Sequence, residues 1–169
     1  MLKTLGLLVT GMSLCACSTL VKATKPGPIQ NDSNAAVLAI PVKGAAAIDI
    51  TEVSVVDSDQ RVYNIDLLDP SYVGPSGVPF YFIPLDPAKN FALVGFGNRS
   101  RTYEYPDIEN AQIKVVPGTI SYIPAVVLVR VNNNTIRTDL AADPVLQRNL
   151  QKELEELFPK YKIDYGFKK

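Results

Sequence analysis

The chain has 169 residues, 17 basic and 17 acidic side chains, 13 prolines, two cysteines and no histidine. Balanced charge argues against nucleic acid as a partner, because nucleic acid binds to a clustered basic face. The absence of histidine excludes Ser-His-Asp and Cys-His catalysis and removes the commonest zinc ligand. The length is that of one ordinary domain.

The N-terminus has the layout of a secretory signal. A short cationic start, Met1–Thr4, precedes an apolar run from Leu5 to Leu14, and LCACS follows at residues 14–18. The run of about ten residues is too short to cross a bilayer core, which takes about 20. The two cysteines of this stretch would alternatively form a metal or redox clip, but the chain offers no histidine and no other cysteine to complete one.

Leu14-Cys15-Ala16-Cys17 resembles the lipobox of bacterial lipoproteins, in which an aliphatic residue and two small residues precede the modified cysteine. The resemblance implies a signal peptide over residues 1–16, cleavage after Ala16 and lipidation of Cys17. By resemblance to Gram-negative sorting rules, Ser18 implies an outer-membrane location facing the periplasm. Residues 17–35 are rich in Pro, Asn, Asp and Ser, and we expect them to form the lipidated cysteine and a flexible tether.

Strand-like segments separated by Pro, Gly, Asn and Asp turns follow, and they predict strands over 36–43, 48–56, 61–67, 78–85, 90–97, 99–105, 111–116 and 119–131. Residues 78–85 are aromatic on both faces, as in a strand buried on both sides. Pro41 predicts an edge strand or a bulge, and Pro124 a break in the last segment. Asp57 and Asp59 indicate a polar turn, because no further acidic residues fit the spacing of a calcium loop.

Helical spacing replaces the strand pattern near the C-terminus. Asp143 as N-cap and Pro144 at the first helical position begin a helix over about residues 144–158, and Pro159 ends it. Its apolar stripe comprises Leu146, Leu150, Leu154, Leu157 and Phe158. We expect this stripe to pack on the rest of the domain, the alternative being a helix offered to a partner. Residues 161–169 either add a short edge strand or remain loose.

These elements predict a mainly β domain over residues 36–169, a single antiparallel β-sandwich of seven or eight strands with one C-terminal α-helix. Residues 78–131 resemble the Ig-like sandwiches of transthyretin-like and carboxypeptidase-regulatory-like domains. The resemblance rests on Leu85-Asp86-Pro87 after an apolar strand, and on Val116-Pro117-Gly118-Thr119 before a strand that bears a tyrosine. It implies a fold and carries no activity.

One strand has the composition of a contact surface. Arg99, Arg101, Tyr103 and Tyr105 share one parity of a polar strand, and arginine and tyrosine are enriched at interfaces. We therefore expect a non-catalytic, membrane-anchored envelope lipoprotein that binds or assembles an envelope protein, without cofactor or metal. The alternative is a glycan- or peptidoglycan-binding module that uses exposed aromatic residues. A carboxylate hydrolase, for which Asp66 and Asp69 would be the pair, is the third hypothesis.

Overall fold

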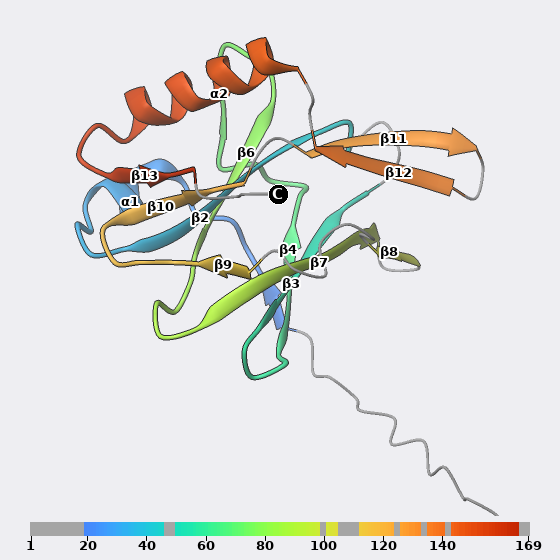
Figure 1. Ribbon diagram of the computed structural model, residues 1–169, viewed down its shortest axis with the longest axis horizontal. Coiled ribbons are helices and arrows are strands. Elements are labelled where there is room, and N and C mark those ends of the chain that lie inside the picture. The colour runs from blue at the N-terminus through green and yellow to red at the C-terminus, as the bar shows by residue number, and fades with distance from the viewer. Residues whose placement is uncertain are drawn as a thin grey trace, which may run out of the picture.

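The computed structural model describes residues 19–45, 50–98, 101–104, 112–123, 126–132, 135–140 and 143–165. Within these residues the chain is mainly β, with two sheets and a helical layer (Figure 1). The first sheet contains, in spatial order, β1 (Thr19–Val21), β4 (Val62–Asp66), β3 (Glu52–Asp57), β7 (Asn90–Asn98) and β8 (Arg101–Glu104), with β9 (Gln112–Lys114) also paired to β7.

The second sheet is built around one central strand, β2 (Ala36–Lys43). On one side of β2 lie β6 and, beyond it, β5. On the other side, β10 pairs with the first half of β2, and β13 pairs with β10. Strand β11 pairs with the end of β2, and β12 pairs with β11. The bounds are β5 (Tyr72–Val73), β6 (Pro79–Pro84), β10 (Thr119–Tyr122), β11 (Val126–Asn132), β12 (Thr135–Leu140) and β13 (Lys162–Asp164). The helices are α1 (Pro26–Gln30) and α2 (Pro144–Leu157).

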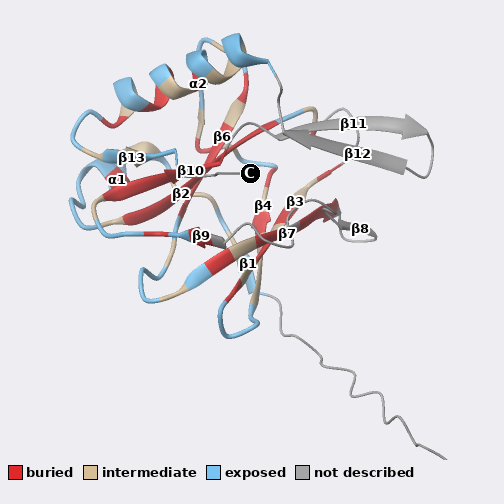
Figure 2. Cartoon of the chain, viewed as in Figure 1, coloured by how far each residue is buried: buried red, intermediate tan, exposed pale blue. Residues whose placement is uncertain are grey.

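The central strands of the second sheet, β2 and β6, are buried on both faces (Figure 2), because they lie between the first sheet and the helices. Strand β6 illustrates the arrangement. Tyr81 and Ile83 belong to the apolar cluster between the sheets, whereas Phe80 and Phe82 belong to the cluster beneath the helices. The prediction that residues 78–85 form a strand buried on both faces is therefore confirmed.

The mainly β architecture with two sheets and a C-terminal helix is confirmed, but the details of the sandwich differ. The described residues form thirteen strands instead of seven or eight, since several strands of two to four residues are too short to show an alternating pattern. The pairing is mixed and not purely antiparallel. Four pairs are parallel, namely β1 with β4, β2 with β10, β2 with β11, and β10 with β13.

The prediction of a flexible tether is wrong from Thr19 onward. Residues 19–21 form β1, which pairs with β4, and the Thr24 N–H donates to the Phe82 carbonyl at 2.8 Å. Ile29 of α1 is only 2% exposed and packs in the cluster beneath the helices. The sequence did not predict this ordered structure, because the isolated apolar residues of the segment follow neither helix nor strand periodicity. Residues 17 and 18 lie outside the described residues.

Of the two alternatives predicted for Pro41, an edge strand or a bulge, the edge strand is wrong, because Pro41 lies in a central strand. On one side Pro41 pairs with Phe80 of β6. On the other side β2 changes neighbour at this point, because the pairing with β10 ends at Ala39 and the pairing with β11 begins at Val42. A residue without an N–H suits a position between two partners, where one ladder hydrogen bond is dispensable.

Helix α2 confirms the prediction for the C-terminal stripe. The Asp143 carboxylate accepts from the N–H groups of Val145 and Leu146, which caps the first turn. Leu150 and Leu154 are buried against the second sheet, and the Phe158 ring meets Phe82 edge-on at 5.1 Å between centroids. The stripe therefore packs on its own domain. Of the two alternatives predicted for residues 161–169, the short strand is present as β13, which pairs with β10.

Candidate functional site

A hairpin and a turn meet at one end of the first sheet, beside the start of β1. The β3–β4 hairpin turns after Asp57, and β1 runs parallel to β4 with Thr19 opposite Tyr63. The Ser58 N–H donates to the Asn90 carbonyl at 2.9 Å, which places the turn before β7 against this hairpin. We call this region the hairpin end, and define it as Thr19, residues 57–63 and residues 86–90.

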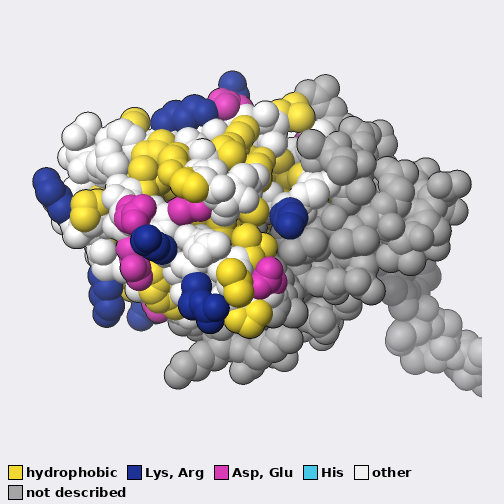
Figure 3. Space-filling view, turned by 90° about the horizontal axis from the view of Figure 1, so that it is seen from above, with side chains coloured by type: hydrophobic (Ala, Val, Ile, Leu, Met, Phe, Trp, Pro, Cys, Tyr) yellow, Lys and Arg dark blue, Asp and Glu magenta, His cyan; other side chains and the backbone are white. Residues whose placement is uncertain are grey.

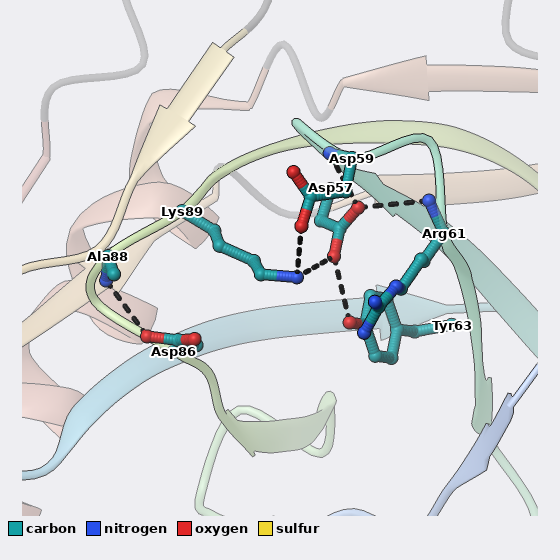
Figure 4. A network of polar contacts seen from close by, with 7 residues as sticks. All are labelled: Asp57, Asp59, Arg61, Tyr63, Asp86, Ala88 and Lys89. Carbon is teal, nitrogen blue, oxygen red and sulfur yellow. Dashed lines mark hydrogen bonds and ion pairs between the residues drawn. The ribbon is translucent and has the colours of Figure 1, made fainter.

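Asp57 is the centre of a polar network at the hairpin end (Figure 4). One of its carboxylate oxygens accepts from the N–H groups of Asp59 and Arg61, each at 2.9 Å. The other accepts from the Tyr63 hydroxyl at 2.9 Å and from the Lys89 ammonium at 2.6 Å. Lys89 also forms an ion pair with the Asp59 carboxylate at 2.8 Å. The network thereby joins the hairpin to the turn before β7.

The contacts of the network shift the pKa values of its side chains. Burial alone would raise the pKa of Asp57, but the hydrogen bonds from Lys89, from the Arg61 backbone and from Tyr63 outweigh it and hold that pKa far below its usual range. The hydrogen bonds that Lys89 donates to Asp57 and Asp59 raise the pKa of its ammonium. Hydrogen bonding to Asp57 and burial raise the pKa of Tyr63. Asp57 and Lys89 are therefore both ionised at neutral pH.

Lys89 occupies the position that a cation would take between the two aspartates. Its Nζ lies 2.6 Å from an Asp57 oxygen and 2.8 Å from an Asp59 oxygen. The interpretation of Asp57 and Asp59 as a polar turn is thus confirmed, with a side-chain ammonium in place of a metal ion. Within the parts of the chain that the structure describes, no group of three or more Cys, Asp or Glu side chains is arranged to hold a metal.

The backbone of the hairpin is fixed by the same carboxylate. Gln60 has a φ of 63°, in the left-handed region that non-glycine residues rarely adopt. The two N–H groups that donate to Asp57 belong to residues on either side of Gln60. Asp57 therefore stabilises a turn conformation that is unfavourable by itself.

A second polar contact joins α2 to the loop before β6. Glu153 is only 7% exposed, and its carboxylate accepts from the Ser76 N–H at 2.6 Å and from the Ser76 hydroxyl at 3.1 Å. A Cβ added at Gly74 would collide with the Glu153 carboxylate and with the Tyr72 ring. The sequence did not reveal this contact, because Glu153 reads as one of several acidic residues beside the apolar stripe.

The predicted contact strand is only partly described. Arg101 and Tyr103 lie on β8, opposite Asn98 and Phe96 of β7. Cys17, Arg99 and Tyr105 lie outside the described residues. Among the described strands, β8 and β1 end the first sheet at its two opposite edges, so the predicted contact strand and the strand that follows Cys17 are separated by the width of this sheet.

The other sequence candidates have structural partners. Asp66 accepts from the Leu68 N–H at 2.8 Å, and Asp69 forms an ion pair with Lys25 at 2.8 Å. The aromatic residues considered for sugar binding are mostly internal: Phe80, Tyr81, Phe82, Phe96 and Tyr122 are buried, and Tyr63 and Tyr72 are half-buried. Burial raises the pKa of Tyr81 to about 12, and its hydroxyl donates to the Leu67 carbonyl at 2.8 Å.

No family model, curated protein or solved structure matches this chain. The resemblances of residues 14–18 and 78–131 therefore stay predictions from the sequence. Neither of the helices in the described residues is long and apolar enough to span a membrane.

Proposed function

We propose that this protein is a non-catalytic lipoprotein, anchored through fatty acylation of Cys17 in the outer membrane of a bacterial envelope, and that its β-rich domain binds an envelope protein. The observation that carries the proposal is LCACS at residues 14–18, directly after a short apolar run. The first described strand begins at Thr19, two residues after Cys17, so the described part of the domain directly follows the implied lipidation site.

Attachment through a lipid is compatible with the balanced charge of this chain. Two or more acyl chains give stable anchoring, at about 0.8 kcal/mol per buried methylene group. Basic and acidic side chains are interspersed on the face that carries α2 (Figure 3), and the whole chain has equal numbers of each. A polybasic attraction to anionic lipid is therefore not what supports membrane binding in this proposal.

The supporting observation for a protein partner is strand β8. It ends the first sheet among the described strands, and an edge strand offers unpaired backbone groups to another chain. Its sequence supplies Arg101 and Tyr103, which are residue types enriched at interfaces. The Asp57 network and the Glu153 contact, in comparison, join parts of the same domain.

Lipidation is tested by expressing the full chain in a Gram-negative host and measuring its intact mass and its membrane fraction. We expect the wild-type protein to lose residues 1–16, to gain the mass of acyl chains and to be extracted only by detergent. Cys17→Ser should abolish the added mass and the membrane attachment, whereas the matched variant Cys15→Ser should keep both. An unmodified wild-type residue 17, or membrane attachment that survives Cys17→Ser, would overturn the proposal.

The partner is tested by chemical cross-linking in intact cells, followed by purification from detergent extracts. We expect one envelope protein to copurify in fixed stoichiometry with the wild type. The double variant Arg101→Ala/Tyr103→Ala should lose it by tenfold or more, whereas Arg148→Ala on the exposed side of α2 should retain it. Absence of any stoichiometric partner from the wild-type extract would contradict the role as an interaction module.

A further inference from the structure

We propose that the hairpin end of the first sheet lies against the phospholipid surface, with Leu20 as an apolar contact beside the acyl chains. The proposal rests on the lipidation of Cys17 in the proposed function, and it adds a fixed orientation of the domain on the membrane. A flexible tether would have left that orientation free; the structure leaves no such tether after residue 18.

Covalent geometry limits how far the hairpin end can lie from the lipid. Consecutive Cα atoms are about 3.8 Å apart, so the Cα of Cys17 lies within about 7.6 Å of the Cα of Thr19. Thr19 pairs with Tyr63, the residue that follows the turn of the β3–β4 hairpin. The short covalent connection therefore keeps the lipid-bearing sulfur close to this hairpin.

The same geometry sets which parts of the domain face away. Figure 1 shows the β3–β4 hairpin and helix α2 on opposite sides of the molecule, with the second sheet between them. A membrane surface against the hairpin end leaves α2 facing the aqueous side. The β1 strand is fixed to both layers, because it pairs with β4 and leads to Thr24, whose N–H donates to Phe82 of the second sheet at 2.8 Å.

Leu20 has the position and the exposure of a membrane contact. Its side chain is 60% exposed, whereas the next residue, Val21, packs against the cluster between the sheets. Leu20 lies three residues from Cys17. An exposed leucine so close to inserted acyl chains can bury its side chain at the boundary between headgroups and hydrocarbon.

The charges of the hairpin end indicate which lipids it accepts. The hairpin end carries two basic side chains, Arg61 and Lys89, and three acidic ones, Asp57, Asp59 and Asp86, and Lys89 is already paired with Asp57 and Asp59. Opposite charges in similar number produce little net field toward a membrane. The contact should therefore form on zwitterionic bilayers and should be insensitive to salt and to the anionic lipid content.

Orientation is tested with the full lipidated protein in vesicles of phosphatidylethanolamine and phosphatidylglycerol that contain a headgroup-labelled quencher lipid. An acylated Cys17 leaves the mature chain without a free thiol, so a single new cysteine can carry a fluorescent probe. We compare Ala88→Cys in the turn before β7 with Asn149→Cys on α2, which are both exposed. We expect quenching at least threefold stronger at position 88 than at position 149, unchanged by salt.

A matched insertion separates orientation from anchoring. Fifteen Gly/Ser residues between Ser18 and Thr19 add a flexible span of about 21 Å on average, which should make quenching at positions 88 and 149 equal while the protein still floats with the vesicles. Equal quenching without the insertion, in protein that does float, would overturn the orientation. Protein that does not float with the vesicles would refute the proposed function itself.

The role of Leu20 is tested in the same assay. Leu20→Ser should reduce quenching at position 88 by about twofold without releasing the protein, and Val73→Ser, which removes another exposed apolar side chain, should leave it unchanged. Circular dichroism verifies that both variants remain folded. Unchanged quenching in a folded Leu20→Ser variant would exclude Leu20 as a membrane contact.

Discussion

Asp57 shows how one buried carboxylate can organise two turns. Its four hydrogen bonds come from two backbone N–H groups, a tyrosine hydroxyl and a lysine ammonium. The sequence predicted the turn but not the network, because Lys89 is 32 residues away and nothing in the pattern relates the two. Side-chain partners that are distant in sequence depend on strand pairing, and strand pairing is a property of the whole fold.

The lowered pKa of Asp57 makes stability depend on pH. In the unfolded chain an aspartate titrates near 3.8, and in the folded state the pKa is lower. The unfolded state therefore binds more protons as pH falls toward and below this value, so the contribution of Asp57 is fully present above about pH 5 and is lost on acidification. We expect urea unfolding of the wild type to show this loss beginning below about pH 5 and continuing below pH 3, since the folded-state pKa is far below 3.8.

Asp57→Asn should unfold at lower urea concentration at pH 7 and should show a flatter acid dependence than the wild type. Asp69→Asn is the matched control, since its ion pair with Lys25 joins two exposed side chains, 80% and 55% exposed. Such a pair contributes about 0–1 kcal/mol. An acid dependence as steep in Asp57→Asn as in the wild type would show that other groups cause it.

At the scale of single elements, prediction from the sequence succeeded where a pattern was long enough. Helix α2 was predicted within one residue of its end, and β2 was predicted over its full length. Strand β12 was missed, because only two of the six residues of Thr135–Leu140, Ile136 and Leu140, are strongly apolar. Strand β1 and helix α1 were missed because three to five residues carry too little periodicity.

Helix α2 also fixes a loop, through Glu153. Replacing Glu153 by Ala should lower the free energy of unfolding by about 1–3 kcal/mol, since the half-buried Ser76 N–H and hydroxyl lose a charged acceptor. Hydrogen exchange of the Ser76 amide should become faster in this variant. The control is Glu156→Ala, which removes an exposed contact with Lys152 at 3.7 Å and should change stability by less than about 0.5 kcal/mol. Equal effects of the two substitutions would contradict the clamping role of Glu153.

The described residues form three layers, two sheets and a helical layer, and the N-terminal segment contacts all three. Residues 19–35 contribute a strand to the first sheet, a hydrogen bond to the second and a buried side chain to the helical layer. The predicted domain boundary at residue 36 would remove all of these contacts. Two packed sheets could be inferred from the sequence, but the way in which residues 19–35 join them could not, because the contacts that do so are with residues distant in sequence.

Removal of residues 1–35 should therefore destabilise the domain strongly, whereas removal of residues 1–18 should not. Loss of Ile29 burial alone corresponds to about 2–5 kcal/mol, a large part of the stability of about 5–15 kcal/mol that is typical of a domain. Limited proteolysis and urea unfolding of the two truncated proteins measure the difference. A cooperative transition of equal midpoint in both would show that the N-terminal segment is dispensable.

The contacts of that segment also determine when folding can be completed during synthesis. The Gln30 side chain donates to the Leu157 carbonyl, 127 residues later, and the Tyr161 hydroxyl donates to the Ile29 carbonyl across 132 residues. The first part of the chain to leave the ribosome thus waits for nearly the last before it acquires its final neighbours. If the chain is exported as proposed, such a delay would favour its passage through a membrane, because the final contacts of its leading segment need residues that are made almost last.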